Sequence, residues 1–479
     1  MLAEKRRLFA WAVIVVFGLA NVVPRAQAAT GGSSAVPSTL NLSSTHANVS
    51  AGRILQSGSV GINIAGRQMT VLPTSMLTPA EMLAVSQIVS VGHQSIQLGL
   101  HGNAVGGSFV FNPASGVNLS ALSVPQNVTG IINFQQATPL TITGGLSDLG
   151  SLFALTVNPS INSVSINARD VGVGAGARLS TVLPPGGISG FADARNDLSL
   201  VLSASHSLVN NGIISAAGDL TLNSRAIANS GSLNSLLGNV NVDNASLRGI
   251  LTINNAGGLI QAANGNVNIG AASLGARSML SIFGGTIQAQ NINFNGGAGA
   301  VDGLLDDLVG TVNVVGGSAH VGGKSGVLEL GNVNVKGDPT FFNQGDIAIN
   351  GNISFGQDLA ILASGNITAG GAFQIVTTDA TGLGHNIVMV AGATLIPEGT
   401  PPPAGTPIIT NTTVGLTGNQ TVIVDGANLT AGGNISLNGS TLDTRGALGK
   451  AGGNVTLVAY GTNSVGGGIG NMSIFTGGS

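Results

Sequence analysis

The sequence predicts an all-β protein, a parallel β-helix with coils of about 20 residues. Only 7% of its 479 residues are charged and 3% are aromatic, whereas 75 are glycine. An ordinary domain is about a quarter charged and about 7% glycine. No long stretch shows the i, i+3, i+4, i+7 spacing of an amphipathic helix. Short strands and tight turns remain, because β-branched residues favour strands while Gly, Asn and Ser favour turns.

A five-residue motif returns at a nearly constant interval, which is the main argument for a solenoid. The motif begins with a turn residue, continues with Asn, Asp or Thr, and ends apolar-x-apolar. Copies start at Asn196, Gly218, Gly238, Gly265, Gln290, Gly310, Gly331, Gly351, Gly433 and Gly453. Successive gaps up to Gly351 are 22, 20, 27, 25, 20, 21 and 20 residues. Such a period indicates stacked supersecondary units, each of which buries its apolar face against its neighbours.

The glycines and asparagines of the motif are expected to be structural. Gly and Asn tolerate left-handed backbone at corners, and the apolar-x-apolar alternation turns one set of side chains inward. A second element, such as LVNNGIISA at 208–216, supplies further strands, so that one unit holds two or three. Equivalent asparagines are expected to stack as amide ladders. The residues assigned this role are Gly218, Gly238, Asn239, Gly265, Asn266, Gly331, Asn332, Gly351, Asn352, Gly433, Asn434, Gly453 and Asn454.

The first residues predict a secretory signal peptide. Three cations at 5–7 precede an apolar run at 8–20, and Ala26-Gln27-Ala28 is a small-residue cleavage site, with cleavage between Ala28 and Ala29. The run is short for a bilayer span, and a retained anchor is the alternative. Removal of residues 1–28 leaves 19 − 1 = 18 acids and 16 − 4 = 12 bases. The mature chain is then mildly acidic, so we expect no nucleic-acid partner.

The remaining chain is divided by composition. Residues 29–195 predict a β-rich N-terminal cap or secretion-like region with one short helix at 77–90, where Thr78 is the N-cap and Pro79 occupies N1. Coils are expected at 196–395 and, after a Pro-rich loop at 396–408, again at 409–479. The last coils have no polar closing repeat, which suggests a piece of a longer protein.

Three stretches, NNGIISAAGDLTLNS, GGTIQAQNINF and GGNISLNGSTLDTRGALGKAGGNVTLVA, resemble the haemagglutinin-type repeats of filamentous haemagglutinin-like adhesins. The resemblance covers about 196–460. It implies a right-handed parallel β-helix, export to the cell surface by a two-partner route with an outer-membrane transporter, and a role in adhesion. The N-terminal region departs from the family pattern because it lacks an Asn-Pro-Asn-Gly motif.

Few residues suggest chemistry. Asp302, Asp306 and Asp307 are the densest acidic group, and we expect them in a solvated insertion between coils, with calcium binding as the alternative. His93 and His101 have no further metal ligand nearby. Arg225, Arg248 and Arg277 recur near the repeat period, and corner solvation is favoured over a sugar site. We therefore expect no catalytic residue, metal or cofactor.

The expected function is that of a non-enzymatic, secreted or cell-surface adhesin that binds a host or neighbouring-cell glycan or protein. A polysaccharide-degrading β-helix enzyme is one alternative, and it requires acids and bases that converge on one face. The other is an extracellular scaffold that self-associates end to end.

Overall fold

The computed structural model describes residues 38–42, 46–50, 60–64, 67–71, 89–91, 94–99, 107–113, 118–124, 126, 128–243, 249–271, 273–392, 394–397, 408–414, 420–423, 432–460 and 467–477. Contacts divide the chain into two units, Met1–Ala35 and Val36–Ser479. Every described residue belongs to the second unit. The predicted signal peptide, with Ala28 and Ala29, lies outside the described residues.

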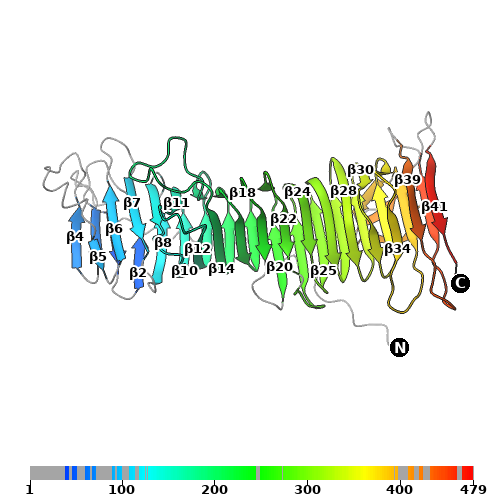
Figure 1. The fold of residues 1–479 in the computed structure, drawn as a ribbon, viewed down its shortest axis with the longest axis horizontal. Helices are drawn as coiled ribbons and strands as arrows, with labels where there is room; N and C mark the ends of the chain where they lie inside the picture. Colours follow the sequence, from blue (N-terminus) through cyan, green and yellow to red (C-terminus); the bar gives the residue numbers. More distant parts are fainter. Residues whose placement is uncertain are drawn as a thin grey trace. The chain divides into compact units, whose positions relative to one another are not determined.

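The described part of the second unit is a parallel β-helix, which confirms the predicted fold class. Its regular elements are all strands, and 35 of them join in one sheet. Within that sheet every pairing is parallel except β5–β6 and β6–β7. Figure 1 shows the strands from β7 onward following one another along the stack, from cyan to red, while β2 lies beside β8. Three strand positions recur in each coil, and we name them faces 1, 2 and 3 in chain order.

Face 1 is made of strands that are confined to it and of longer strands that it shares with a neighbouring face. Those confined to it are β16 (Leu220–Ser224), β19 (Val240–Asp243), β22 (Val267–Gly270), β31 (Ile353–Phe355) and β34 (Gln374–Thr377). Four strands bend from face 1 into face 2: β8 (Asn118–Val124), β10 (Leu140–Asp148), β12 (Ser163–Val173) and β14 (Ser199–Asn210). Five bend from face 3 into face 1: β24 (Thr286–Asn295), β26 (Asp307–Gly316), β28 (Val327–Val335), β39 (Ile435–Asp443) and β41 (Ile469–Phe475).

The other two faces are made of shorter strands. Face 2 holds β17 (Ala226–Asn229), β20 (Ile250–Asn254), β23 (Met279–Phe283), β25 (Ala300–Leu305), β27 (Ser318–Gly323), β29 (Pro339–Asn343), β32 (Leu359–Ala363), β35 (Ile387–Ala391) and β40 (Val455–Ala459). Face 3 holds β7 (Gly107–Asn112), β9 (Val128–Asn133), β11 (Ser151–Leu155), β13 (Arg178–Ser180), β15 (Ile213–Ala216), β18 (Ser232–Ser235), β21 (Leu259–Ala262), β30 (Asp346–Ile349) and β33 (Ile367–Ala369).

In-register pairing places equivalent apolar residues in continuous inward columns. On face 1, Leu220 pairs with Val240, Val240 with Val267, and Val267 with Ile292. All four side chains are fully buried. Burial of such a side chain contributes about 1.5–3 kcal/mol, and the contribution repeats in every coil. The core therefore consists of stacked columns of Leu, Ile and Val, which needs neither aromatic bulk nor disulfides.

The coils begin upstream of the boundary expected at Asn196. Parallel pairing joins β8 to β10, β10 to β12 and β12 to β14 on faces 1 and 2, and it joins β7, β9, β11 and β13 on face 3. Much of the predicted cap region 29–195 thus has the same fold as the repeats. These early coils lack the Gly-Asn corner motif, so the motif marks only part of the solenoid.

The described start of the chain contains strands of a different arrangement. A hairpin of β5 (Val89–Val91) and β6 (Gln94–Gly99) pairs antiparallel with β7, and β2 (His46–Ser50) pairs with β8. A separate sheet holds β1 (Ser38–Leu42), β3 (Val60–Ile64) and β4 (Arg67–Val71). Residues 77–88 of the predicted helix lie outside the described residues, and 89–90 belong to strand β5.

The interruption of the coils is longer than the predicted Pro-rich loop at 396–408. Strands β36 (Thr394–Pro397), β37 (Ile408–Val414) and β38 (Gln420–Ile423) form a separate antiparallel sheet. Coil pairing resumes at β39, which is joined to β33 on face 3 and to β34 on face 1. The residues from 409 to Ile423 were expected to form coils, but their described strands pair only with one another.

Candidate functional site

The repeated motif, the strongest signal in the sequence, forms corners of the coils. At the corner that leads into face 1, a side-chain oxygen of one coil accepts the backbone N–H of the next. Asn239 N donates to Asp219 Oδ1 at 2.7 Å, and Asn266 N donates to Asn239 Oδ1 at 2.9 Å. Gly265 has no room for a side chain, since a Cβ there would lie 2.3 Å from Gly238 O. Glycine permits the close approach of the coils, and asparagine satisfies the corner amide.

A second, exterior ladder runs along the middle of the face 1 strands. The Nδ2 groups of Asn268, Asn293 and Asn313 donate to the Oδ1 of the preceding coil's asparagine, with Asn241 as the first acceptor, at 2.7–2.9 Å. All four side chains are half-buried. Both asparagines of the GNVNV copy at Gly238 therefore bond to equivalent asparagines of the next coil.

The copy at Gly331 does not occupy the register of the copies at Gly238 and Gly265. Val333 pairs with Val314, which pairs with Phe294 in the column of the motif's second apolar residue. Accordingly, Asn332 N donates to Asn313 Oδ1 at 2.8 Å, so a corner asparagine stacks on a strand asparagine. Asn352 N then donates to Asn332 Oδ1 at 3.2 Å. The second residue of the motif at Gly331 therefore stacks on the fourth residue of the preceding copy, a shift of two residues. The ladder of side-chain hydrogen bonds continues across this shift.

The last copies lie at the other two corners. Asn434 N donates to Asn366 Oδ1 at 3.0 Å, at the corner that leads into face 3. Asn454 N donates to Asn386 Oδ1 at 2.9 Å, at the corner that leads into face 2. One sequence motif thus serves all three corners of the coil.

The expected acidic insertion is not an insertion. Asp302 lies in β25, Asp307 begins β26, and Asp306 occupies the corner between them. Lys324 Nζ lies 2.9 Å from Asp306 Oδ1, and this hydrogen bond lowers the pKa of Asp306. Asp302 is half-buried on face 2, and burial raises its pKa to about 6. The three carboxylates therefore have different environments, and within the described chain no group of three His, Asp or Glu side chains is placed to hold a metal ion.

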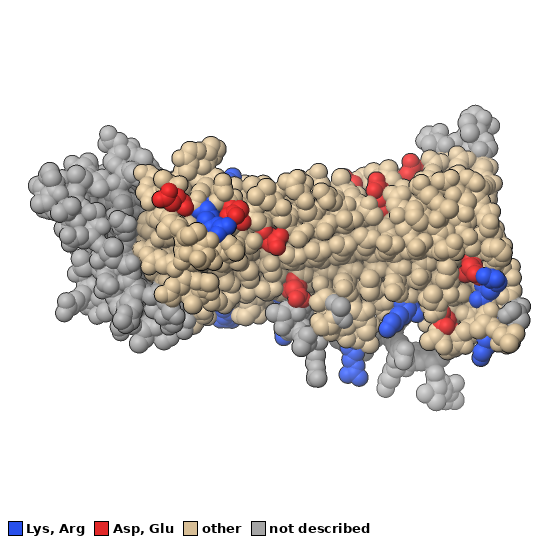
Figure 2. Space-filling view, in the orientation of Figure 1, with Lys and Arg blue, Asp and Glu red and all other residues tan. Residues whose placement is uncertain are grey.

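Two of the three arginines singled out by the sequence, Arg225 and Arg277, lie at the corner between faces 1 and 2. Arg225 separates β16 from β17, and Arg277 precedes β23. Arg248, His93 and His101 lie outside the described residues. Figure 2 shows the charged side chains of one face scattered among wide uncharged areas. Several of the described cations pair with an acid close by, as Arg195 does with Asp197 at 2.6 Å and Arg445 with Asp443 at 2.5 Å.

One cluster carries the residue types of a nucleophilic triad, which sequence reasoning missed because they come from two coils. His206 Nδ1 lies 2.5 Å from Asp170 Oδ1, and Ser207 Oγ donates to the same oxygen at 2.8 Å. These contacts outweigh the effect of partial burial, so the pKa of Asp170 is lowered. The carboxylate lies between the hydroxyl and the imidazole. A catalytic triad needs the imidazole in the middle, so that it can take the proton of the nucleophile.

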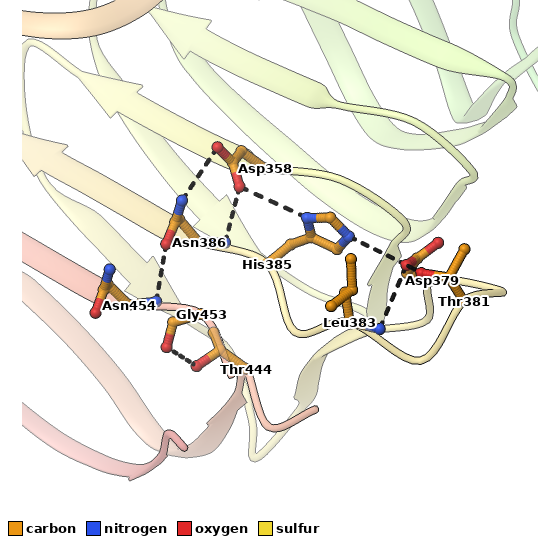
Figure 3. Close-up of polar contacts among 9 residues, drawn as sticks. All are labelled: Asp358, Asp379, Thr381, Leu383, His385, Asn386, Thr444, Gly453 and Asn454. Carbon is orange, nitrogen blue, oxygen red and sulfur yellow. Dashed lines mark hydrogen bonds and ion pairs between the residues drawn. The ribbon is translucent and has the colours of Figure 1, made fainter. Parts of the chain in front are cut away.

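A second cluster, at the corner between faces 1 and 2, places His385 between two carboxylates (Figure 3). His385 Nδ1 lies 3.9 Å from Asp358 Oδ1, and Nε2 lies 3.5 Å from Asp379 Oδ2. Asp358 Oδ1 also accepts Asn386 N–H at 2.9 Å, so this aspartate starts the ladder that Asn386 and Asn454 continue. Thr381 Oγ1 donates to Asp379, which lowers the pKa of that carboxyl.

The loop that carries His385 is tied to the next coil by backbone hydrogen bonds. Gly384 N donates to Ala451 O, and Ala447 N donates to Gly382 O, each at 2.8 Å. Because the imidazole lies between Asp358 and Asp379 (Figure 3), it occupies the space that a substrate would need between two catalytic carboxylates. The loop is thus tied to the next coil by backbone hydrogen bonds and contacts the preceding coil through His385 and Asp358.

No protein-family model and no curated protein matches this chain. Among the residues that the structure describes, no helix has the length and apolarity of a membrane span.

Proposed function

We propose that this chain is a non-enzymatic, exported β-solenoid of the haemagglutinin-type adhesin class, which presents a repetitive polar surface for attachment. The proposal rests mainly on the partners of the polar and ionisable side chains. Outward asparagines bond to their equivalents one coil away, and several of the ionisable groups pair with near neighbours. The signal-peptide pattern and the resemblance of the repeats support export and adhesion.

The surface of the coils suits a ligand that is recognised by many weak polar contacts. Side-chain amides carry both a donor and an acceptor, as sugar hydroxyls do. Asn241, Asn268, Asn293 and Asn313 repeat this pair at the spacing of stacked strands, about 4.8 Å. A surface glycan or protein of a host or neighbouring cell is therefore the proposed partner, and an outer-membrane transporter is the proposed export partner.

Adhesion and catalysis can be tested on the same preparation. Beads coated with the exported chain should attach to cultured epithelial cells or to bacterial cells more than beads coated with heat-denatured chain do. The same protein, incubated with polygalacturonate, should release neither reducing ends nor unsaturated products. Attachment no better than that of the denatured control would overturn the adhesin proposal, and cleavage of the polymer would overturn its non-enzymatic part.

A further inference from the structure

Face 2 of the C-terminal coils carries a buried apolar cluster outside the core. It consists of Phe342, Ala360, Leu362 and Val390, which we call the outer stripe. Strand alternation points these side chains away from the coil interior, since their neighbours Phe341, Ile361 and Met389 belong to the main core. The outer stripe is nevertheless 0–8% exposed. A further layer of chain must therefore cover it.

The register shows that the outer stripe is one continuous column. Phe342 pairs with Leu362, and Leu362 pairs with Val390. The column is continued in the other direction by Gly322, which pairs with Phe342. A Cβ at Gly322 would lie 2.0 Å from the Phe342 ring, so glycine leaves room for the ring there.

The same outward positions differ in the central coils and on the neighbouring face. On face 2, Ala226 and Asn254 are exposed, and Thr252 is half-buried. On face 3 of the C-terminal coils, Thr368 is exposed and Ala348 is half-buried. Within the C-terminal coils, outward side chains are therefore fully buried on the stretch of face 2 that ends beside Tyr460 and not at these positions of face 3.

We infer that strands β36, β37 and β38, which lie in the segment between Gly392 and Gly433, pack on the outer stripe as a second layer. The segment leaves the coil directly after β35, a strand of the stripe, and returns beside the same place. Gly433 N donates to Tyr460 O at 2.7 Å, and a Cβ at Gly392 would lie 3.1 Å from that oxygen. Tyr460 itself packs against the outer stripe. Both ends of the segment are thus held at the edge of the surface that it covers.

The composition of the segment fits this position. Each of its strands contains apolar residues, including Leu395 in β36, Ile409 in β37 and Val422 in β38. A small antiparallel sheet needs an apolar partner layer for stability, and the outer stripe of face 2 offers one. This inference goes beyond the proposed function and does not depend on it.

Thiol labelling tests the inference cleanly, because the chain has no cysteine. Val390→Cys in the full chain should react slowly with a soluble maleimide. Replacing 394–431 with a short Gly-Ser linker should raise that rate about tenfold or more, since protection by a packed layer is lost. Thr368→Cys, on face 3, is the matched control and should react equally fast in both backgrounds. Fast labelling of Val390→Cys in the intact chain would show that the stripe is not covered, and slow labelling after the deletion would show that another layer covers it; either result would overturn the inference.

Cysteine pairs keep the inference testable if the shortened chain does not fold. Val388→Cys, at the side of the stripe, is combined in turn with Leu395→Cys, Ile409→Cys and Val422→Cys. At least one pair should form an intramolecular disulfide under mild oxidation, and none should form when Thr368→Cys replaces Val388→Cys. Cross-links to Thr368→Cys, or only between chains, would contradict packing of the segment on its own face 2.

Discussion

The interior corner between faces 2 and 3 is filled differently in the central and the N-terminal coils. In the central coils, Asn210 Nδ2 donates to Asn229 Oδ1 at 2.7 Å, and Asn229 Nδ2 donates to Asn255 Oδ1 at 2.6 Å. In the N-terminal coils the same column holds Asp148, paired in register with Val124 and Val173. A buried amide that meets another amide is satisfied in both directions, whereas a carboxyl between two valines is not.

The surroundings of the isolated carboxyl shift its pKa. Asp148 is fully buried; its Oδ1 accepts Gly150 N–H at 3.0 Å, and Oδ2 has no hydrogen-bond partner. Burial raises its pKa to about 7, against the opposing effect of the Gly150 and Leu152 backbone amides. Polar groups inside a solenoid are therefore tolerated either as ladders or as neutral acids.

The largest expected effect is the dependence of stability on pH at Asp148. The folded pKa is raised, so the folded state binds a proton that the unfolded state releases above about pH 4. Stability should therefore fall as pH rises from about 4 to about 7, by up to about 4 kcal/mol for a shift of about three units. Asp148→Asn should abolish this slope in urea unfolding followed by circular dichroism. Below about pH 4 the two proteins should be equally stable, and a slope that persists in the variant would assign the effect to other groups.

The next effect concerns the amide ladder. Asn229→Ala removes the middle amide, so Asn255 Oδ1 loses its donor in a fully buried position. We expect a loss of about 2–3 kcal/mol, the usual cost of an unsatisfied buried group together with a small cavity. Long repeat arrays do not unfold in one step, so hydrogen exchange of coils β17 to β20 should accompany urea unfolding. Unchanged exchange there would show that the ladder does not stabilise these coils.

A substitution at Val173 would convert one arrangement into the other. Val173 pairs with Asp148 below and with Asn210 above, so Val173→Asn would join the carboxyl to the ladder. Its amide can donate to Asp148 Oδ2, and a hydrogen bond to the charged form should lower the Asp148 pKa by about one unit. Stability at pH 8 relative to pH 4 should improve by about 1.4 kcal/mol. Val173→Thr is a control of similar size, and an equal improvement there would argue against the amide bond.

The sequence predicted the coil but not the use of its motif at different corners. A Gly-Asn pair before apolar-x-apolar specifies a corner and an inward strand, because glycine permits close approach and asparagine satisfies the next amide. It does not specify which corner, since that depends on the pairing partner in the preceding coil. Hence Asn239, Asn434 and Asn454 look alike in sequence and lie at three different corners.

The start of the coils and the polar clusters were missed for a related reason. No Gly-Asn pair precedes β10 or β12, so the motif is absent where the fold is already present. The contacts of His206 with Asp170, and of His385 with Asp358, join residues from different coils. Which residues of two coils become neighbours depends on the number of residues in each coil, and this number varies with the insertions.

The smallest expected effect is on the exterior ladder, and it sharpens the contrast with Asn229. Asn268 donates to Asn241 and accepts from Asn293, as Asn229 does with its own neighbours, but its side chain is only half-buried. Water can replace both bonds, so Asn268→Ala should cost no more than about 0.5 kcal/mol in the same urea assay. Because Asn229 and Asn268 make equivalent hydrogen bonds, a comparison of the two alanine variants separates the effect of burial from the effect of hydrogen bonding. A loss at Asn268 as large as that at Asn229 would mean that stacking of amides stabilises the coils regardless of solvent.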